Sequence, residues 1–254
     1  MKVQSALLEF TLRLADNALV LAQRLCEWIT RAPVLEEEMA LANIAIDLLG
    51  HAKMLYGEYV AQEEGCGDID ALIFGREPHG YKNYTMLEIP NGDFARTIVR
   101  QLLYTTYCWH LYEDLSRSRS EFFAQYARAA RLDNENHLAH ARQWAKVLAT
   151  GTEESGERLR TAVFDVAPHA NQLFEEDAAL STMIEKGIAG DPKRFYGKWR
   201  ADVESALAEG DIVFPDVPGV HASAAVSPDA HTDGFGDLID TMQSVYRSGQ
   251  GGSW

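Results

Sequence analysis

The sequence predicts an all-α protein of the ferritin-like four-helix bundle class, with additional C-terminal helices. Three observations support this class. Apolar residues recur at helical spacing over four long segments, short turns join these segments into two pairs, and a long crossover connects the pairs. No stretch of alternating polar and apolar residues predicts a strand. We expect residues 1–254 to form a single domain, with the core bundle at about 5–150 and the C-terminal helices and tail at about 153–254.

Composition and charge exclude several classes of function. The 254 residues include 23 Lys and Arg against 38 Asp and Glu, so the formal net charge is −15. Because an acidic surface repels phosphate groups, we expect no binding to nucleic acid or to an anionic membrane. No uncharged apolar run reaches the roughly 18 residues of a membrane-spanning helix. The start of the chain does not resemble a signal peptide, and the scattered cysteines form no Cys-x-x-Cys pair, which indicates a cytoplasmic location.

The first pair of helices is predicted at residues 5–30 and 34–62. Apolar residues in the first segment step by three and four positions, as on one face of a helix. Pro33 marks the turn, and three glutamates at 36–38 lie in the first turn of the second helix, where the helix dipole favours negative charge. The short connection predicts an antiparallel hairpin.

The second pair follows a crossover at residues 65–93. This crossover contains seven glycines and prolines, but it also carries many large apolar residues, so we expect it to be ordered. Asp93 is a suitable N-cap for the third helix. A short polar turn at 116–120 then separates the third helix from the fourth.

Further helices are predicted after the bundle. A helical segment at residues 153–186 must kink or split at Pro168, because proline disrupts a helix interior. Asp191 followed by Pro192 is a typical helix start, and the helix reaches about residue 208.

The remaining tail is rich in Pro, Gly, Ala and Ser over residues 210–229. Within it, we expect residues 215–228 to be able to order against a partner, since a loop this long usually has a function. A last short helix is predicted at 233–246.

Two of the predicted helices each carry an Asp and a His four residues apart, which places both side chains on one helix face. The pairs are Asp47 with His51 and Asp133 with His137. Di-iron carboxylate bundles use one Glu from each of two helices and a Glu-x-x-His motif from each of the other two. The two hairpins therefore look like diverged copies of one metal-binding unit.

The antiparallel register shows that this candidate site is incomplete. Asp16 falls near the level of Asp47 and His51, whereas Asp133 falls opposite about Thr105. At that level the third helix offers Tyr, Thr and Cys but no carboxylate, and a pair of bridged metal ions would lack charge and ligands. We therefore interpret six residues as remnants of a degenerate site: Asp16, Asp47, His51, Thr105, Asp133 and His137.

Other interpretations stay open beside this one. We favour a hydrogen-bonded polar cluster in which Asp16, Asp47 and His51 satisfy one another. A single bound metal ion and an intact di-metal centre are the alternatives, and His51 leaves a residual metal affinity open. His137 and His140 are three residues apart and could bind an adventitious transition-metal ion. The other histidines have no partner recognisable in the sequence: His79, His110, His169, His221 and His231.

Three function classes are compatible with these residues. The chain is a non-catalytic scaffold subunit, a di-iron or di-manganese oxygenase in its own right, or a ferritin-like iron-storage or metal-binding protein. No nucleophile elbow, P-loop, Rossmann glycine pattern or His-Glu-x-x-His motif indicates another chemistry.

Several longer segments resemble one known family. Residues 11–28 and 41–50 are similar to the C subunits of phenylacetyl-CoA epoxidase, also called ring-1,2-phenylacetyl-CoA monooxygenase. The resemblance covers nearly the whole chain. It extends to residues 90–94 and 97–101, to Gly187–Pro192, to His231-Thr-Asp, to Met242-Gln243 and to the terminal Trp254.

The resemblance implies a structural subunit of an oxidoreductase complex in cytosolic phenylacetate catabolism. In such complexes, a related A subunit holds a di-iron centre and epoxidises the aromatic ring of the CoA thioester with O₂. The C subunit shares the ferritin-like fold, has lost iron ligands and pairs with A. A small B subunit bridges heterodimers, and a flavin and iron–sulfur reductase supplies electrons. The resemblance therefore implies no catalytic residue and no cofactor in this chain.

Overall fold

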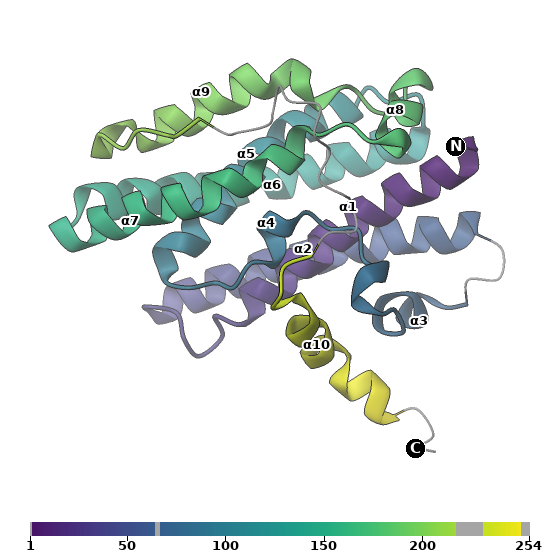
Figure 1. The fold of residues 1–254 in the computed structure, drawn as a ribbon, viewed down its shortest axis with the longest axis horizontal. Helices are drawn as coiled ribbons and strands as arrows, with labels where there is room; N and C mark the ends of the chain where they lie inside the picture. The colour runs from purple at the N-terminus through teal and green to yellow at the C-terminus, as the bar shows by residue number, and fades with distance from the viewer. Residues whose placement is uncertain (1, 64–66, 217–230, 250–254) are drawn as a thin grey trace. The chain divides into compact units, whose positions relative to one another are not determined.

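The computed structural model describes residues 2–63, 67–216 and 231–249. In this part of the chain the fold is all-α, with ten α-helices, four short 3-10 helices and no strand (Figure 1). The chain divides into two compact units, residues 1–90 with 226–254 and residues 91–225. Each unit contains one of the two expected long hairpins. The expectation of a single domain stays a prediction.

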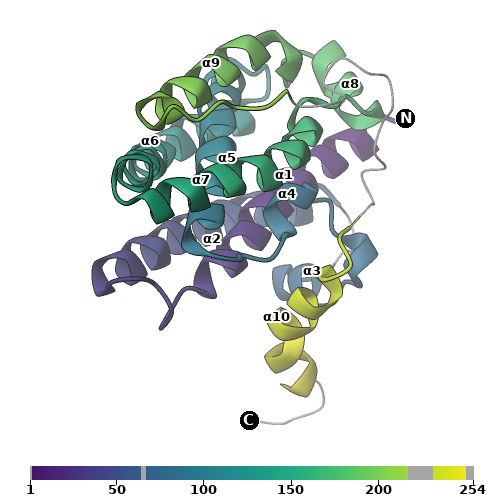
Figure 2. The same ribbon diagram turned by 60° about the vertical axis from the view of Figure 1, so that its left-hand side comes forward.

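The first unit is built on an antiparallel hairpin of two long helices (Figures 1 and 2). Its helices are α1 (Val3–Cys26), α2 (Leu35–Gln62), α3 (Ile69–Phe74), η1 (Pro78–Gly80), α4 (Thr85–Glu88) and α10 (Phe235–Gly249). The short elements of the crossover pack on this hairpin, and α10 packs against α3 and η1. A C-terminal helix thus completes a unit that the N-terminal hairpin begins.

The second unit contains the other long hairpin and the later helices. Its elements are α5 (Phe94–Leu115), α6 (Glu121–Thr150), α7 (Glu153–Val166), η2 (Ala167–Phe174), α8 (Ala178–Glu185), η3 (Pro192–Phe195), α9 (Tyr196–Leu207) and η4 (Ala208–Gly210). Helices α7 and α9 both pack on the α5–α6 hairpin. Trp199 of α9 is fully buried, and its indole Nε1 donates a hydrogen bond to the carbonyl of Leu103 at 3.0 Å.

The predicted helix boundaries agree closely with the structure. Asp93 caps α5 by accepting a hydrogen bond from the backbone N–H of Arg96 at 3.0 Å. The segment containing Pro168 splits into α7 and a 3-10 turn, as expected. The largest difference is at the end of α1, which stops at Cys26 rather than near Thr30; Thr30 adopts a left-handed φ of 72° in the turn. Helix α10 ends at Gly249, three residues later than expected.

Two further findings concern membrane-spanning helices and the stretch that was expected to order on a partner. None of the described helices is both long enough and apolar enough to cross a membrane. Apart from its first two residues, the stretch 215–228 expected to order on a partner lies outside the described residues.

Candidate functional site

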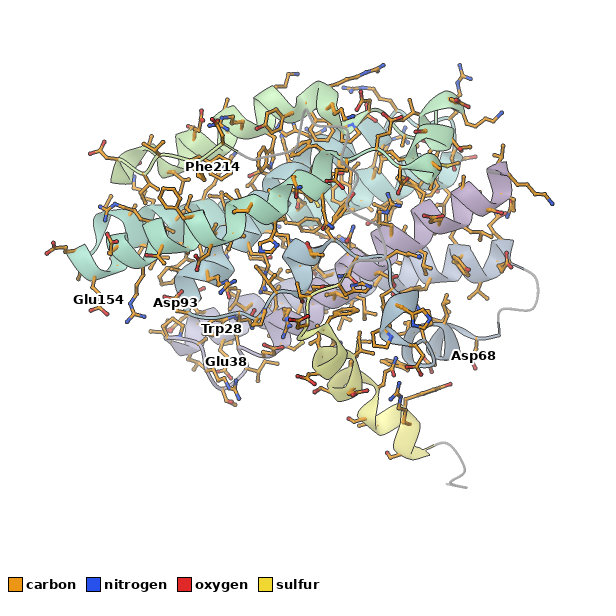
Figure 3. The ribbon with its side chains drawn as sticks, viewed as in Figure 1. Trp28, Glu38, Asp68, Asp93, Glu154 and Phe214 are labelled. Atoms are coloured by element: carbon orange, nitrogen blue, oxygen red, sulfur yellow. The ribbon has the colours of Figure 1, made fainter. Side chains whose placement is uncertain are left out.

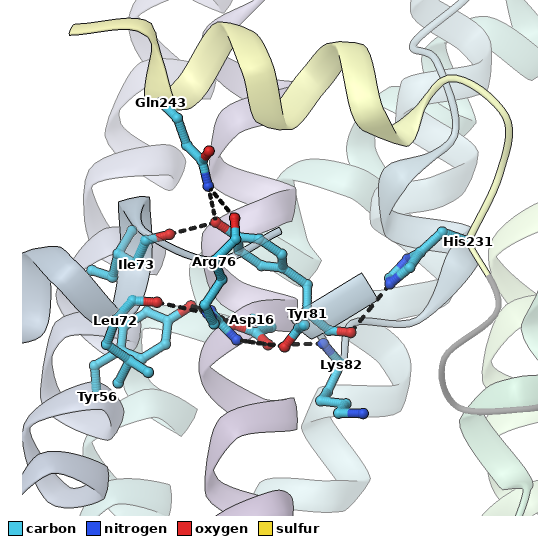
Figure 4. A network of polar contacts seen from close by, with 10 residues as sticks. Asp16, Tyr56, Leu72, Ile73, Arg76, Tyr81, Lys82, His231 and Gln243 are labelled. Carbon is cyan, nitrogen blue, oxygen red and sulfur yellow. Dashed lines mark hydrogen bonds and ion pairs between the residues drawn. The ribbon is translucent and has the colours of Figure 1, made fainter. Parts of the chain in front are cut away.

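Asp16 lies at the centre of a buried polar network in the first unit. It projects from α1, and its side chain is fully buried. Both carboxylate oxygens accept two hydrogen bonds each (Figure 4). Oδ1 accepts from the Tyr56 hydroxyl at 2.5 Å and from Nη2 of Arg76 at 2.5 Å. Oδ2 accepts from Nη1 of Arg76 at 2.9 Å and from the backbone N–H of Lys82 at 2.8 Å. The four acceptor positions of the carboxylate are therefore occupied.

The guanidinium of Arg76 is equally saturated. Besides its two bonds to Asp16, it donates from Nε to the carbonyl of Leu72 at 2.6 Å and from Nη1 to the carbonyl of Gly80 at 2.9 Å. Nη2 also donates to the Tyr56 hydroxyl at 3.2 Å. All five N–H donors of the guanidinium thus have acceptors. A buried ion pair with this geometry avoids the cost of an unsatisfied buried charge.

The pKa values of the neighbouring groups follow from burial and from this ion pair. Burial raises the pKa of Tyr56 well above its ordinary value, and the Asp16 carboxylate raises it further. Burial acts to lower the pKa of Arg76, but the charge and hydrogen bonds of Asp16 outweigh it, so the net shift is upward. Arg76 therefore stays protonated and Tyr56 stays neutral near pH 7.

Helix α10 contributes to the same network through Gln243, which is fully buried. Its amide Nε2 donates to the carbonyl of Arg76 at 2.7 Å and to the hydroxyl of Tyr81 at 3.0 Å (Figure 4). The Tyr81 hydroxyl in turn donates to the carbonyl of Ile73, and the Arg76 guanidinium lies 4.1 Å from the Tyr81 ring centroid. The network thus joins α1, α2, the crossover and the C-terminal helix.

A second carboxylate anchors the start of the C-terminal segment. Glu88 is fully buried and accepts hydrogen bonds from Asn83 at 2.8 Å, from Nδ1 of His231 at 2.7 Å and from the backbone N–H of Thr232. The other ring nitrogen of His231 lies 3.1 Å from the carbonyl of Tyr81. Both ring nitrogens of His231 therefore face oxygen atoms, one of a carboxylate and one of a backbone carbonyl.

We expected Asp16 to pair with Asp47 and His51, but the structure gives Asp16 other partners. Among the described residues, its hydrogen-bonding partners are Tyr56, Arg76 and Lys82. Helical side chains lean toward the N-terminus of their own helix. In an antiparallel hairpin, this lean brings the Asp16 side chain toward the C-terminal end of α2. It therefore contacts a residue about one helical turn after the α2 residue that lies level with the Asp16 backbone. His51 is buried, and Asp47 is half-buried.

The second hairpin places Thr105 as expected. The side-chain amide of Asn134, next to Asp133, donates to the carbonyl of Thr105 at 3.0 Å, which confirms the predicted register. The Thr105 hydroxyl donates within its own helix, to the carbonyl of Gln101 at 2.6 Å. The buried residues of α5 include no Asp or Glu. His137 on α6 is buried, and Asp133 is half-buried.

Near Thr105, α5 also buries hydroxyl groups and a thiol, and α6 buries a tyrosine hydroxyl. The Tyr112 and Tyr126 hydroxyls are 3.5 Å apart, and burial raises the pKa of both. Burial also raises the pKa of the Cys108 thiol to about 12. These groups stay neutral at ordinary pH, so this region lacks the anionic oxygen donors that iron or manganese prefers.

The residues present therefore do not fit a di-metal centre. Among residues 2–63, 67–216 and 231–249, no three His, Cys, Asp or Glu side chains come together so as to hold a metal ion. Asp16 is already held by internal donors, and Thr105 provides no charge.

Sequence reasoning missed the role of Arg76 and the carboxylate partners of two histidines. Arg76 lies in the crossover, and no local pattern distinguishes it from a surface arginine. Two histidines for which no partner was recognised have carboxylate partners: His231 meets Glu88, and Nε2 of His110 lies 2.8 Å from Asp202. Both pairs join residues more than 90 positions apart. Only the large apolar residues around Arg76 could have signalled a buried environment.

Comparisons with known proteins agree on one family. The family model described as "Phenylacetic acid catabolic protein" matches residues 1–254. The chain is also similar to the C subunit of the 1,2-phenylacetyl-CoA epoxidase of Escherichia coli (strain K12). The two sequences are 36% identical over 247 residues, which cover 96% of this chain and 98% of that relative.

Proposed function

Because the chain belongs to the phenylacetic acid catabolic protein family, we propose that it is the C subunit of a phenylacetyl-CoA epoxidase and has no active site of its own. This family is ferritin-like, so the predicted all-α, ferritin-like fold class is confirmed. In the proposed role, the chain pairs with and stabilises a catalytic A subunit that contains the di-iron centre. A bridging B subunit and a reductase complete the complex in the cytoplasm.

One observation carries the non-catalytic part of this proposal. The buried carboxylate of Asp16, a candidate ligand remnant, is neutralised by Arg76 and accepts four hydrogen bonds from the protein. A metal ion would have to displace a buried guanidinium that has no other partner for its charge among these contacts. The absence of a buried acid on α5 supports the same conclusion.

This arrangement suits a structural role. The Asp16 network fixes the crossover and α10 on the α1–α2 hairpin through side chains that are saturated and buried. Such a network gives a rigid surface for packing against a catalytic partner. Its carboxylate offers no open ligand position, because protein donors occupy its acceptor positions.

Metal analysis tests the proposal. The chain and a di-iron A subunit encoded with it are expressed together, and separately, in iron-supplemented medium. We expect a stable complex whose iron accompanies the A subunit, and far less than one iron per chain in the isolated C subunit. Two tightly bound irons in the isolated chain would contradict the proposal and favour an oxygenase in its own right. Assembly into an iron-loaded cage would favour a storage protein.

Two single variants test whether the remnant histidines bind metal. His51→Ala and His137→Ala are expected to leave both metal content and activity of the complex unchanged. A drop in bound iron on either substitution would show that the corresponding His retains metal affinity.

A further inference from the structure

An unusual concentration of exposed apolar side chains lies along α2. Among the described residues, most helices expose none or one large apolar side chain, and α6 exposes two. Helix α2 exposes five, four of which are at least 45% accessible. They are Leu35 (67%), Met39 (59%), Ile46 (64%), Leu49 (36%) and Met54 (45%). Such clusters on a protein surface usually mark an interaction site.

Four of these residues, with Ala42, form a regular stripe. Leu35, Met39, Ala42, Ile46 and Leu49 step by four and three residues, the spacing of core positions in a coiled coil. On a helix of 3.6 residues per turn they span an arc of roughly 80° and a length of roughly 21 Å. We call these five residues the α2 stripe.

The α2 stripe is separate from the face that forms the core of its own unit. The buried apolar side chains of α2 belong to Leu41, Ile44, Ala45, Leu48, Ala52 and Leu55. Their centre lies roughly 130° around the helix from that of the α2 stripe, and α2 packs on α1. Helix α2 is therefore apolar on two faces, and the described residues cover only one of them, as expected for a helix that pairs twice.

Shape and charge both indicate what covers the α2 stripe. Ala42 is small, and Gly50, at the edge of the stripe, has nothing within 4 Å of where a Cβ would lie, so another helix can approach closely. Glu36 and Glu38 flank the stripe on either side at its N-terminal end (Figure 3 labels Glu38). A fitting partner helix thus has an apolar stripe flanked at one end by Lys or Arg.

A second copy of this chain fits less well. Parallel self-pairing would bring together the glutamates at 36–38 of both copies. Antiparallel pairing about Ala42 would place Glu36 and Glu38 opposite small uncharged residues, including Gly50. Parallel pairing supplies no opposite charge. A longer antiparallel overlap brings the exposed Lys53, four residues beyond Leu49, toward Glu36, but each copy carries a net charge of −15, which opposes self-association.

We propose that the α2 stripe is the surface along which a helix of the catalytic subunit lies, with basic residues of that helix beside Glu36 and Glu38. This inference rests on the proposed function and adds to it the surface through which the two subunits pair.

Binding measurements with matched variants test the proposal. Met39→Glu and Ile46→Glu place a charge in the α2 stripe, and both sites are so exposed that folding is retained, which circular dichroism and thermal melting check. Leu132→Glu on α6 is the matched control, because Leu132 is 68% exposed and Ile46 is 64% exposed. We expect each stripe variant to raise the Kd for the purified di-iron subunit by roughly tenfold or more. The control variant should bind within about twofold of the unchanged chain, since isolated exposed apolar residues contribute little.

Charge reversal tests the flanks of the stripe. Glu36→Lys combined with Glu38→Lys should slow association and weaken its dependence on salt, because the attraction that steers the partner is reversed. Association rates measured at two salt concentrations report both effects.

The outcomes separate the two proposals. If the unchanged chain does not bind the catalytic subunit, the proposed function fails, and this inference fails with it. If the unchanged chain binds and both folded stripe variants bind equally well, only this inference is overturned. It is also overturned if Ile46→Glu abolishes self-association of the chain but leaves the complex intact, because the stripe then pairs with a second copy.

Discussion

The two hairpins of this chain bury polar groups in different ways. The hairpin of α1 and α2 retains a buried carboxylate, Asp16, and balances it with the guanidinium of Arg76. The hairpin of α5 and α6 has no acid among the buried residues of α5, and neutral hydroxyl, amide and thiol groups lie at the corresponding level. The first hairpin thus buries a carboxylate and balances it with a guanidinium, whereas the buried residues of α5 include the guanidinium of Arg100 but no carboxylate.

This difference illustrates two ways in which a ferritin-like bundle satisfies polar groups in its core. An anionic ligand can be kept as part of an ion pair, which demands exact geometry because both charges are buried. Alternatively, a buried position can hold a side chain whose hydrogen bond stays within its own helix, as for Thr105 and Gln101. The two regions should therefore respond differently to substitution and to pH.

The largest effect is expected at Arg76. Arg76→Met leaves the Asp16 carboxylate buried without its counter-ion, so the free energy of unfolding should fall by about 3–5 kcal/mol. Urea denaturation followed by circular dichroism measures this loss. The double variant Asp16→Leu with Arg76→Met should recover most of the stability, because two apolar side chains replace the ion pair.

A surface arginine provides the matched control. Arg117 pairs with Glu113 at 3.0 Å but is 71% exposed, so Arg117→Met should cost less than about 1 kcal/mol. Similar losses for Arg76→Met and Arg117→Met would mean that the Asp16 ion pair does not hold the first unit together.

Alkaline pH should weaken the second hairpin through Cys108. Burial raises the pKa of this thiol to about 12, from about 9 when it is exposed. The unfolded chain therefore loses the proton first, so the stabilisation is complete below pH 9 and is lost as the pH rises from 9 toward 12. By pH 10.5 the loss from this one group should reach about 2 kcal/mol.

The variant Cys108→Ala isolates this contribution. Its free energy of unfolding should fall less between pH 8 and pH 10.5 than that of the unchanged chain, by about 2 kcal/mol. Cys26 is half-buried and its pKa is also raised by burial, so Cys26→Ala serves as a comparison with a smaller expected effect. Parallel stability curves for Cys108→Ala and the unchanged chain would refute the assignment.

The sequence predicted the helices because their signals are local. Asp93, Pro168 and the Asp191-Pro192 pair mark starts and breaks through their own backbone chemistry, and each acts in the structure as expected. The register that sets Asp133 beside Thr105 was also accessible, since a short turn fixes which residues face each other. Thr30 was not predicted, because nothing in its sequence surroundings requires a positive φ.

The composition of the buried networks could not be predicted in the same way. Residues 16, 56, 76 and 243 meet from four separate segments, and nothing local encodes that meeting. The error at Asp16 came from comparing backbone levels, whereas the lean of helical side chains decides which residues touch. The polar character of the core was thus foreseen, but the identity of the counter-ion was not.

The smallest expected effects come from helix caps, which again separate the two units. Asp93 accepts from the backbone N–H of Arg96 at the start of the 22-residue α5, whereas Asp68 accepts from that of Ala71 at the start of the six-residue α3. Each cap satisfies one free backbone N–H. If the two helices contributed equally to global stability, each Asp→Ala substitution would lower the free energy of unfolding by the same amount, about 1 kcal/mol or less. Because α5 carries many buried residues and α3 only two, Asp93→Ala should lower the global free energy of unfolding by about 1 kcal/mol, while Asp68→Ala should loosen α3 locally. Hydrogen exchange resolved by residue distinguishes the two. Equal global losses would show that α3 unfolds only together with the rest of the chain.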